Sequence, residues 1–356
     1  MADKARVAVV LPIAPPMLES IRKVSDRLDV VYLSAMQRLM YREGRPLWPG
    51  YNEPPPAGEE TEEQAKATVA EVLAATEVLL SNPMVPDTIL QRAPNLKWLQ
   101  LTSAGVDRLI DSDLVRSGKV MVTTASGIHA VPIGEYVIGS MLAFAKGFPR
   151  AFRNQEKNLW QGYVATELEG ATVGILGLGA IGRHVARLAQ GMGMRVLATR
   201  RSQKERMPGE DAGEPFVTEI FPRDEIPALL GQSDYVVLAV PLTDESRHMI
   251  GEAELRAMKP NAVIVNIARG AVIDQPALIA ALKKGAIGGA ALDVTDPEPL
   301  PADSELWGLD NVMVTPHISG GTPKYMTRAI ELFCDNLRRY LEGETLRNVV
   351  DPSRGY

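Results

Sequence analysis

Short apolar runs rich in β-branched residues alternate with amphipathic segments along most of the chain. Two series of runs can be separated, the first near residues 6–12, 29–33, 77–82, 96–102 and 119–123, and the second opening at Thr172 and continuing through residues 234–241, 262–270, 289–294 and 311–319. Strands that alternate with helices in this way form parallel sheets with helices on both faces. The pattern therefore predicts an α/β fold with two doubly wound parallel sheets.

The segment between the two series, residues 128–147, is apolar on nearly every side when drawn as a helix. We expect this helix to be buried all round, by the interior of its domain or by a second subunit. A last amphipathic pattern, residues 322–344, follows the second series and would fold back onto the first sheet. We therefore expect one discontinuous domain of residues 1–127 and 319–356, a second domain of residues 128–318, and a cleft between them.

Residues 42–64 form a segment rich in proline, glycine and acidic residues, in which Pro54, Pro55 and Pro56 exclude a helix or a central strand. A segment of this length without a structural pattern is typical of a surface insertion. It lies in the first domain, so the substrate preference of related proteins is a weaker guide to the substrate of this one.

Composition narrows the class of protein. The chain has 356 residues, 46% of them hydrophobic, and a formal net charge of −6. These values suit two domain cores and argue against a nucleic-acid partner, which would need a strongly basic face. No apolar run reaches the roughly 18 to 20 residues that span a bilayer, and the first residues lack a signal-peptide pattern, so we expect no membrane partner and a cytoplasmic location. The single cysteine, Cys334, excludes an intrachain disulfide and falls at a helical core position.

A glycine-rich turn joins an apolar strand to an amphipathic helix. Its glycines are Gly177, Gly179 and Gly182, at the spacing that allows a tight turn, close approach of the backbone to a pyrophosphate, and packing of the helix on the strand. The N–H groups of the helix start, which includes Ala180 and Ile181, face such a phosphate. The turn and its flanking elements predict a Rossmann dinucleotide-binding domain.

The end of the next strand indicates which dinucleotide is bound. Folds specific for NAD usually carry an acidic residue there, which accepts hydrogen bonds from the adenosine ribose. This chain has Arg200, Arg201 and Ser202 instead. A guanidinium group pairs with the 2′-phosphate that distinguishes NADP from NAD, so the sequence predicts a preference for NADP(H). The alternative is that both arginines are solvated surface residues.

Four blocks of sequence, taken in their order and spacing, resemble the D-isomer-specific 2-hydroxyacid dehydrogenase family over essentially the whole chain. The blocks are LTSAGVDRL at 101–109, the glycine turn at 174–182, NIARGAVID at 266–274, and ALDVTDPEPLP at 291–301 paired with VTPHISG at 314–320. The resemblance implies a flavodoxin-like substrate domain beside the Rossmann domain. It also implies a homodimer, because the helix around residues 131–145 and the segment 148–163 resemble the family's subunit-embracing arm.

The family's catalytic arginine, glutamate and histidine correspond to Arg269, Glu298 and His317. Reduction of a 2-keto acid needs a hydride at the carbonyl carbon and a proton at its oxygen, and a histidine can supply that proton. By resemblance, Glu298 would orient the imidazole and favour its protonated form. Arg269 would bind the carboxylate and keto oxygen of the substrate.

The resemblance assigns further positions to ligand binding. The block Ser103, Ala104, Gly105 and Val106 follows an apolar strand, and its backbone N–H groups would cradle the substrate's carboxylate. Asp293 would lie near the nicotinamide carboxamide and Pro241 near the adenosine half of the cofactor. The remaining histidines, His129, His184 and His248, match no catalytic position, and no acids stand at ligand spacing with His or Cys. We therefore expect no metal site.

Two positions refine the expected activity. Thr295 stands where an aromatic residue usually follows the Asp-Val pair, so we expect looser packing below the catalytic loop, while Glu298 is retained where formate dehydrogenases of this fold carry glutamine. We expect an NADP(H)-preferring 2-keto acid reductase acting on glyoxylate or hydroxypyruvate. The alternatives are an NAD-dependent D-2-hydroxyacid or phosphoglycerate-type dehydrogenase and, in another class, a dinucleotide-sensing corepressor or scaffold.

Overall fold

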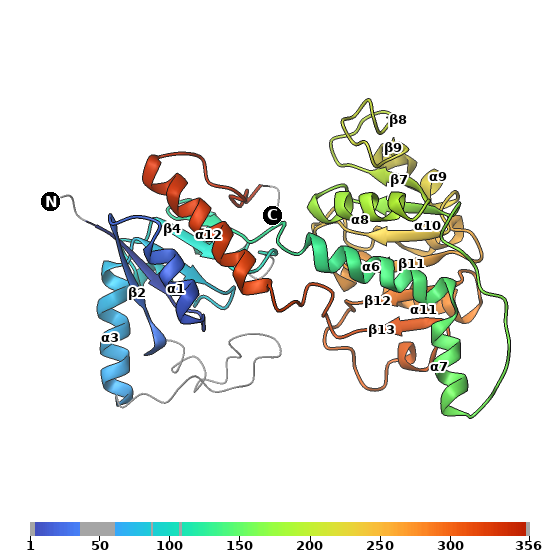
Figure 1. Ribbon diagram of the computed structural model, residues 1–356, viewed down its shortest axis with the longest axis horizontal. Coiled ribbons are helices and arrows are strands. Elements are labelled where there is room, and N and C mark those ends of the chain that lie inside the picture. Colours follow the sequence, from blue (N-terminus) through green and yellow to red (C-terminus); the bar gives the residue numbers. More distant parts are fainter. Residues whose placement is uncertain (1–3, 36–60, 87, 107–108, 354–356) are drawn as a thin grey trace. The chain divides into compact units, whose positions relative to one another are not determined.

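The computed structural model divides into two compact units (Figure 1). Unit 1 comprises Met1–Ile128 and Pro323–Tyr356, and unit 2 comprises His129–Thr322. The structure describes residues 4–35, 61–86, 88–106 and 109–353. Both units have a sheet whose strands alternate with helices along the chain, which confirms the α/β fold with two doubly wound sheets.

Most of the predicted insertion, residues 42–60, lies outside the described residues. Its last part is not loop, because Thr61 caps helix α3 (Glu62–Ala75), which the sequence pattern did not predict. The Thr61 hydroxyl accepts from the N–H of Gln64, and the Gln64 side chain accepts from the N–H of Thr61. This reciprocal pair satisfies two N–H groups that a helix start leaves open, and acidic residues favour the same position. The acidic end of the segment is thus the first turn of a helix.

Unit 1 contains a five-stranded parallel sheet with the order β2-β1-β3-β4-β5. The strands are β1 (Ala5–Val9), β2 (Leu28–Tyr32), β3 (Val78–Ser81), β4 (Trp98–Leu101) and β5 (Met121–Thr123). Other helices described in this unit include α1 (Pro15–Arg22), α4 (Ile89–Arg92), α5 (Asp113–Arg116) and α12 (Tyr325–Glu342). Each strand coincides with an apolar run of the first series, as the hydrophobic pattern predicted.

Alternate residues of these strands point to opposite faces, and both faces are covered. On one face Ala8 and Leu79 pack with Val69 of α3, and on the other Val9 and Leu80 belong to the cluster of Phe333 in α12. A strand buried on both sides is apolar at nearly every position. This explains why the first series consists of continuous apolar runs.

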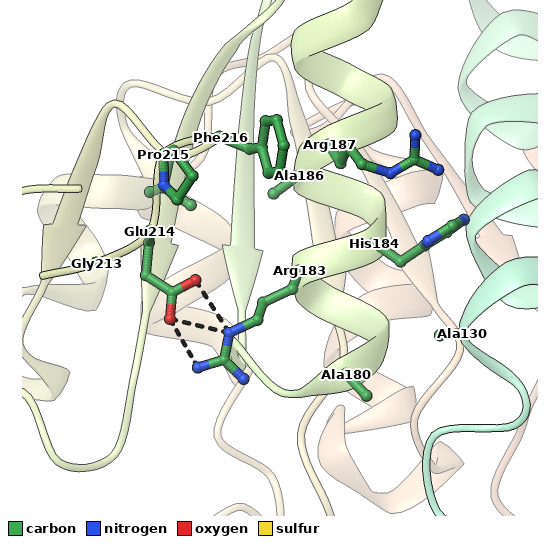
Figure 2. Close-up of a pocket in the computed structure, with 11 residues that line it drawn as sticks. Ala130, Ala180, Arg183, His184, Ala186, Arg187, Gly213, Glu214, Pro215 and Phe216 are labelled. Carbon is green, nitrogen blue, oxygen red and sulfur yellow. Dashed lines mark hydrogen bonds and ion pairs between the residues drawn. The ribbon is translucent and has the colours of Figure 1, made fainter. Parts of the chain in front are cut away.

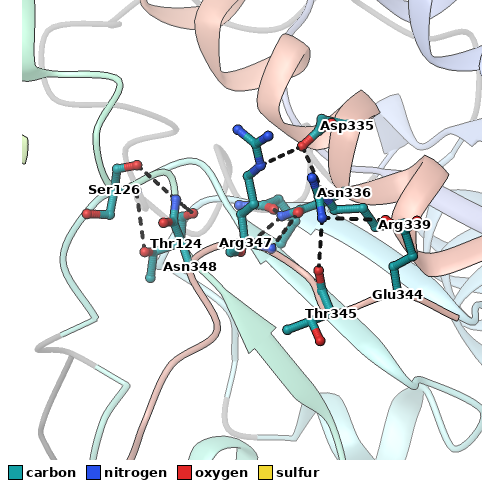
Figure 3. A network of polar contacts seen from close by, with 10 residues as sticks. Thr124, Ser126, Asp335, Asn336, Arg339, Glu344, Thr345, Arg347 and Asn348 are labelled. Atoms are coloured by element: carbon teal, nitrogen blue, oxygen red, sulfur yellow. Dashed lines mark hydrogen bonds and ion pairs between the residues drawn. The ribbon is translucent and has the colours of Figure 1, made fainter.

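A buried polar network holds the end of the chain on the sheet of unit 1 (Figure 3). Asn336 of α12 is fully buried and donates to Gln100 Oε1 at 3.0 Å and to the carbonyl oxygen of Arg347 at 3.2 Å. Its own Oδ1 accepts from the N–H of Arg347 at 2.8 Å. Gln100 Oε1 also accepts from the hydroxyl of Thr123 on β5 at 2.8 Å. The network therefore joins α12, the tail and two strands.

Unit 2 contains an eight-stranded sheet with the order β13-β12-β11-β10-β6-β7-β9-β8. The strands are β6 (Thr172–Leu176), β7 (Arg195–Thr199), β8 (Met207–Pro208), β9 (Glu219–Phe221), β10 (Tyr235–Leu238), β11 (Val263–Asn266), β12 (Gly289–Leu292) and β13 (Val312–Val314). Its α-helices are α6 (Ala130–Ala145), α7 (Phe148–Glu156), α8 (Ala180–Gly191), α9 (Ile226–Leu230), α10 (Glu252–Ala257) and α11 (Gln275–Lys283). Short 3₁₀ turns are η1 (Arg223–Glu225), η2 (Gly270–Val272) and η3 (Glu305–Gly308).

The sheet of unit 2 is parallel, as predicted, except at one edge. Strand β8 pairs antiparallel with β9, with Met207 opposite Ile220. The two strands are joined by a loop instead of a crossover helix, and a strand that returns by a loop runs antiparallel to its neighbour. This loop, residues 209–218, lies beside α8. No pattern in the sequence predicted it.

The sequence predicts that helix α6 is buried all round, by its own domain or by a second subunit, and within unit 2 it is buried on one side. One side packs on α8 and buries Val137 and Met141, whereas Val131, Glu135 and Gly139 form an exposed stripe at intervals of one helical turn. The exposed stripe is the part of α6 that the other described elements of unit 2 leave uncovered.

Helix α7 and the residues after it project from unit 2 with little cover (Figure 1). No residue of α7 is buried. The exposed large apolar side chains of this arm, residues 148–164, are Phe148, Phe152, Leu159, Trp160, Tyr163 and Val164. Removal of large apolar side chains from water is favourable, so their clustering on one projecting segment indicates a protein contact.

Among the helices that the structure describes, none is long and apolar enough to cross a membrane.

Replacement of Asn336 by leucine is expected to lower the free energy of unfolding by about 2 to 4 kcal/mol, because the buried Gln100 loses one of its two donors and the N–H and carbonyl oxygen of Arg347 lose their partner. The measurement is chemical denaturation followed by circular dichroism. The matched control is Asp335→Asn, one residue earlier, which removes exposed ion pairs to Arg339 and Arg347 and should cost less than about 1 kcal/mol. Equal effects of the two changes would show that the buried network does not anchor the tail.

Candidate active site

The sequence-predicted residues of unit 2 gather at one edge of its sheet. The last residues of five strands, taken across the sheet, lie in register as Leu176, Leu238, Asn266, Leu292 and Val314, and Leu176 also pairs with Thr199. Segments that follow parallel strands in register emerge at a common edge, where α/β sheets bind their ligands. Gly177, Gly179, Arg200, Pro241, Arg269, Asp293 and His317 all lie within three residues after one of these strand ends.

Glycine occupies each of the three positions of the turn for a different physical reason. Gly177 has φ 102°, and a Cβ atom there would lie 2.6 Å from the carbonyl oxygen of Ala239. A Cβ atom on Gly182 would collide with the carbonyl oxygen of Gly177, so this position lets α8 pack against the strand. At Gly179 a Cβ atom would meet nothing within 4 Å. That open space is where backbone can approach a bound phosphate.

Helix α8 begins at Ala180, with Gly179 as its extended cap residue. Ala180, Ile181 and Gly182 form the first turn, where backbone N–H groups have no partner within the helix. These groups and the helix dipole favour an anion at this end. The residues therefore fit a dinucleotide pyrophosphate.

The two arginines after β7 are held by carboxylates that the sequence analysis missed. Arg200 Nη2 donates to Gln203 Oε1 at 3.1 Å, and its Nη1 lies 3.6 Å from Glu214. Arg200 Nε is buried and has no hydrogen-bond partner. Arg201 donates to Glu245 at 3.1 Å. Ser202 follows in an exposed turn.

Asp293 organises the loop that carries His317. Its side chain is buried and accepts from the Thr315 hydroxyl at 2.6 Å, from the N–H of Ile318 at 2.8 Å and from the N–H of Ser319 at 2.9 Å. These bonds fix both sides of His317, whose φ of 53° is uncommon for a residue other than glycine. A strained backbone of this kind persists only where the surroundings define it. The family resemblance assigns Asp293 to the cofactor, and no sequence pattern indicates this structural role.

His317 and Glu298 form a hydrogen-bonded pair, with Nδ1 2.6 Å from Oε1. An ionised carboxylate can only accept, so this geometry places a proton on Nδ1 and turns Nε2 away from Glu298. The side chains remain 48% and 41% exposed, so the imidazole is accessible to a ligand. The pair can therefore deliver or accept a proton through Nε2.

Arg269 lies between β11 and η2, half-buried, with Nη1 donating to the carbonyl oxygen of Ala268 at 2.8 Å. Asn266 donates to the carbonyl oxygen of Arg269 at 3.0 Å and fixes the turn. Gly270 follows because a Cβ atom there would collide with the backbone of Thr295. Thr295 is itself buried and donates to the carbonyl oxygen of Pro297 at 2.9 Å. The loops that carry Arg269 and Glu298 are thus packed together.

Tyr136 of α6 supports the same loop and was missed by sequence reasoning. Its hydroxyl lies 2.7 Å from Thr315 Oγ1, which in turn donates to Asp293. Burial raises the pKa of Tyr136, so the phenol keeps its proton near neutral pH. A tyrosine at helical spacing in an apolar segment gives no signal of this contact, because only the packing of α6 brings it to the loop.

The block Ser103 to Val106 lies in unit 1, after β4. The Ser103 hydroxyl donates to the carbonyl oxygen of Gly105 at 2.9 Å, and the N–H of Ala125 donates to the carbonyl oxygen of Ser103 at 2.8 Å. Ala104 and Gly105 are half-buried, and Val106 is buried. The Tyr325 hydroxyl donates to the carbonyl oxygen of Thr102 at 2.6 Å and ties the turn to α12. The turn is thus firmly held, with its central residues accessible.

The other residues named from the sequence are not part of the group formed by Arg269, Glu298 and His317. Pro241 is exposed after β10, and its carbonyl oxygen accepts from the Ser246 hydroxyl at 2.6 Å. Cys334 is buried in α12, and burial raises the pKa of its thiol to about 11. Within the described ranges, no group of three or more His, Cys, Asp or Glu side chains could hold a metal ion.

The family model for the D-isomer specific 2-hydroxyacid dehydrogenase NAD binding domain matches residues 138–319. Two relatives are similar over most of this chain. The glyoxylate reductase of Korarchaeum cryptofilum is 35% identical over 282 residues, which cover 77% of this chain and 81% of that protein. The D-3-phosphoglycerate dehydrogenase of Methanocaldococcus jannaschii is 36% identical over 276 residues, which cover 77% of this chain but only about half, 51%, of that longer protein.

The fold as a whole has a counterpart among solved structures. A D-isomer specific 2-hydroxyacid dehydrogenase from Xanthobacter autotrophicus Py2, in complex with NADPH and MES, matches with a TM-score of 0.76 at 29% identity and covers 100% of both chains. The family match, the relatives and the geometry of the sheet edge agree. The chain therefore belongs to the D-isomer-specific 2-hydroxyacid dehydrogenase family, whose members are NAD(P)-dependent oxidoreductases acting on CH–OH groups.

Proposed function

We propose that the protein reduces a small 2-keto acid, glyoxylate or hydroxypyruvate, with NADPH as the preferred cofactor. The observation that carries the reaction type is the His317–Glu298 pair at 2.6 Å, on the strand edge that also bears the glycine turn. Glyoxylate as substrate draws support from the activity of the Korarchaeum cryptofilum relative. NADPH draws support from Arg200 and from the cofactor bound to the Xanthobacter autotrophicus relative.

The residues of unit 2 fit a dinucleotide. Gly179 leaves open space at the start of α8, and Arg200 has a buried Nε without an acceptor. We assign the pyrophosphate to the N–H groups of Ala180 and Ile181, and the adenosine 2′-phosphate to Arg200, Arg201 and Ser202. Pro241 is assigned to the adenosine half and Asp293 to the side of the nicotinamide. When bound, the cofactor would supply the hydride.

The protein's own groups supply the rest of the reduction. Arg269 binds the substrate's carboxylate and keto oxygen and stabilises the negative charge that grows on that oxygen. His317 donates its Nε2 proton to the oxygen while the carbonyl π bond breaks, and Glu298 holds the imidazole through Nδ1. In unit 1, the N–H groups of Ser103 to Val106 form a carboxylate-binding turn. The product is the 2-hydroxy acid.

We also propose that the protein is a homodimer. The arm of residues 148–164 exposes six large apolar side chains, with Trp160 and Val164 almost fully exposed at 102% and 96%. The stripe of Val131, Glu135 and Gly139 on α6 is uncovered in the single chain. A second copy of the chain would bury both surfaces, and a stable dimer needs an apolar area of this kind.

Replacing His317 or Arg269 by alanine is expected to lower kcat/KM for glyoxylate by about a hundredfold or more, because proton transfer or charge stabilisation is lost. Steady-state assays with NADPH measure the effect, and cofactor affinity should change little. The matched control is His248→Asn, since His248 is also exposed and also has a positive φ, of 51°. Near-normal turnover of His317→Ala would remove His317 from the mechanism.

The wild-type protein is expected to prefer NADPH over NADH by at least about tenfold in kcat/KM, the factor that one charged hydrogen bond supplies. Arg200→Asp should repel the 2′-phosphate and move the preference toward NADH. Arg195→Asp, at the other end of β7, makes the same charge change and should leave the preference unchanged. A panel of glyoxylate, hydroxypyruvate and 3-phosphohydroxypyruvate with both cofactors measures substrate and cofactor preference together. Equal use of NADH by the wild type would overturn the assignment of the arginines.

Light scattering at micromolar concentration is expected to give the mass of a dimer. Trp160→Glu should shift the population toward monomer, because a charge would be buried in the contact. Met192→Glu places the same charge on another exposed apolar residue of unit 2 and should leave the dimer intact. A monomeric wild type would contradict the proposal.

A further inference from the structure

A second arginine stands beside the predicted 2′-phosphate site, on a different element. Arg183 follows Gly182 on α8 and faces Glu214 of the loop between β8 and β9, residues 209–218 (Figure 2). Its Nε donates to the two Glu214 oxygens at 2.9 and 3.0 Å, and its Nη2 donates to Oε1 at 2.6 Å. The Glu214 side chain is only 10% exposed. Arg183 is thus the counter-ion of a nearly buried carboxylate.

Arg200 forms a longer ion pair with the same carboxylate but no hydrogen bond to it. Its Nη1 lies 3.6 Å from Glu214 Oε1, beyond hydrogen-bond distance, while its Nε is buried without a partner. Among the described residues, the hydrogen bonds to the Glu214 carboxylate come from Arg183. Arg200 therefore keeps donors that an additional acceptor can take.

The charges of the cluster explain why it matters that Arg183, and not Arg200, makes the hydrogen bonds to Glu214. Two arginines and one glutamate give the cluster a net charge of about +1, whereas Glu214 without Arg183 would be a nearly buried anion next to Arg200. Such an anion would attract the Arg200 guanidinium and repel an incoming phosphate dianion. The hydrogen bonds to Glu214 raise the pKa of Arg183, so the counter-ion keeps its charge.

We propose that Arg183 is a positioning residue for cofactor selectivity: by binding Glu214, it leaves the donors of Arg200 for the 2′-phosphate of NADPH. This inference rests on the proposed NADPH preference and adds a residue to it. Arg183 acts through Glu214 and Arg200, on the adenosine end alone. It should therefore matter for NADPH and hardly at all for NADH.

The chain offers a matched control on the same helix. Arg187 lies one turn beyond Arg183, and both line a pocket of about 410 Å³ together with His184, Glu214 and Phe216 (Figure 2). Replacing Arg187 by glutamine removes the same charge from the same pocket. It leaves the three hydrogen bonds between Arg183 and Glu214 in place. The pair of variants thus separates the specific contact from a general loss of positive charge.

The experiment measures Kd by fluorescence titration and kcat/KM for both cofactors in the full-length protein. For Arg183→Gln we expect NADPH binding to weaken by about tenfold or more while NADH binding changes by less than about threefold, since a charged hydrogen bond is lost only at the phosphate. Arg183→Gln with Glu214→Gln should restore NADPH binding to within about threefold of wild type, because the competing carboxylate is gone. Arg187→Gln should bind both cofactors like the wild type.

Glu214→Gln alone tests the inference without altering Arg183, and thermal melting confirms that each variant is folded. It should keep or increase the preference for NADPH. The inference is overturned if Glu214→Gln loses the preference for NADPH, or if Arg183→Gln weakens both cofactors equally. It is also overturned if the double variant does not regain NADPH binding, or if Arg187→Gln weakens NADPH binding as much as Arg183→Gln does. A wild type without NADPH preference overturns the proposed function as well, whereas a wild type with the preference and an unaffected Arg183→Gln variant overturns this inference alone.

Discussion

Backbone pairing in a common register is the constraint on which the rest of unit 2 depends. Because five parallel strands end in line, the loops that follow them emerge at one edge, and residues more than a hundred positions apart in sequence become neighbours of one surface. A slip of one residue would turn every side chain of the slipped strand to the other face and disrupt both packed cores. The register therefore fixes the core and the candidate site together.

The buried carboxylate of Asp293 transmits that order to His317. It accepts three hydrogen bonds from the loop after β13, and Tyr136 of α6 reaches the same group through Thr315. Buried polar groups are costly unless they are satisfied, and a satisfied cluster defines one loop conformation. The half-exposed pair of His317 and Glu298 can thus be accessible without being loosely placed.

Charge is arranged differently at the far end of the same edge. Arg183 and Arg200 approach Glu214, and Arg201 and Arg223 both bind Glu245. Each carboxylate lies between two arginines, so neither group of charges is neutral. A site of this kind holds guanidinium groups in place while keeping an excess of positive charge, which suits a ligand with a phosphate group.

The sequence alone determined the α/β fold, all strands except β8 and β9, and the glycine turn, because hydrophobic periodicity and glycine spacing are local properties of the chain. It also indicated Arg269, Glu298 and His317, because their residue types suit the chemistry and their motifs resemble a family. Only the tertiary structure revealed the antiparallel β8, the exposed stripe of α6 and the partners Tyr136, Arg183 and Glu214. These features depend on contacts between distant segments, and no local pattern records which side chain of another element will meet a buried carboxylate or leave a helix uncovered.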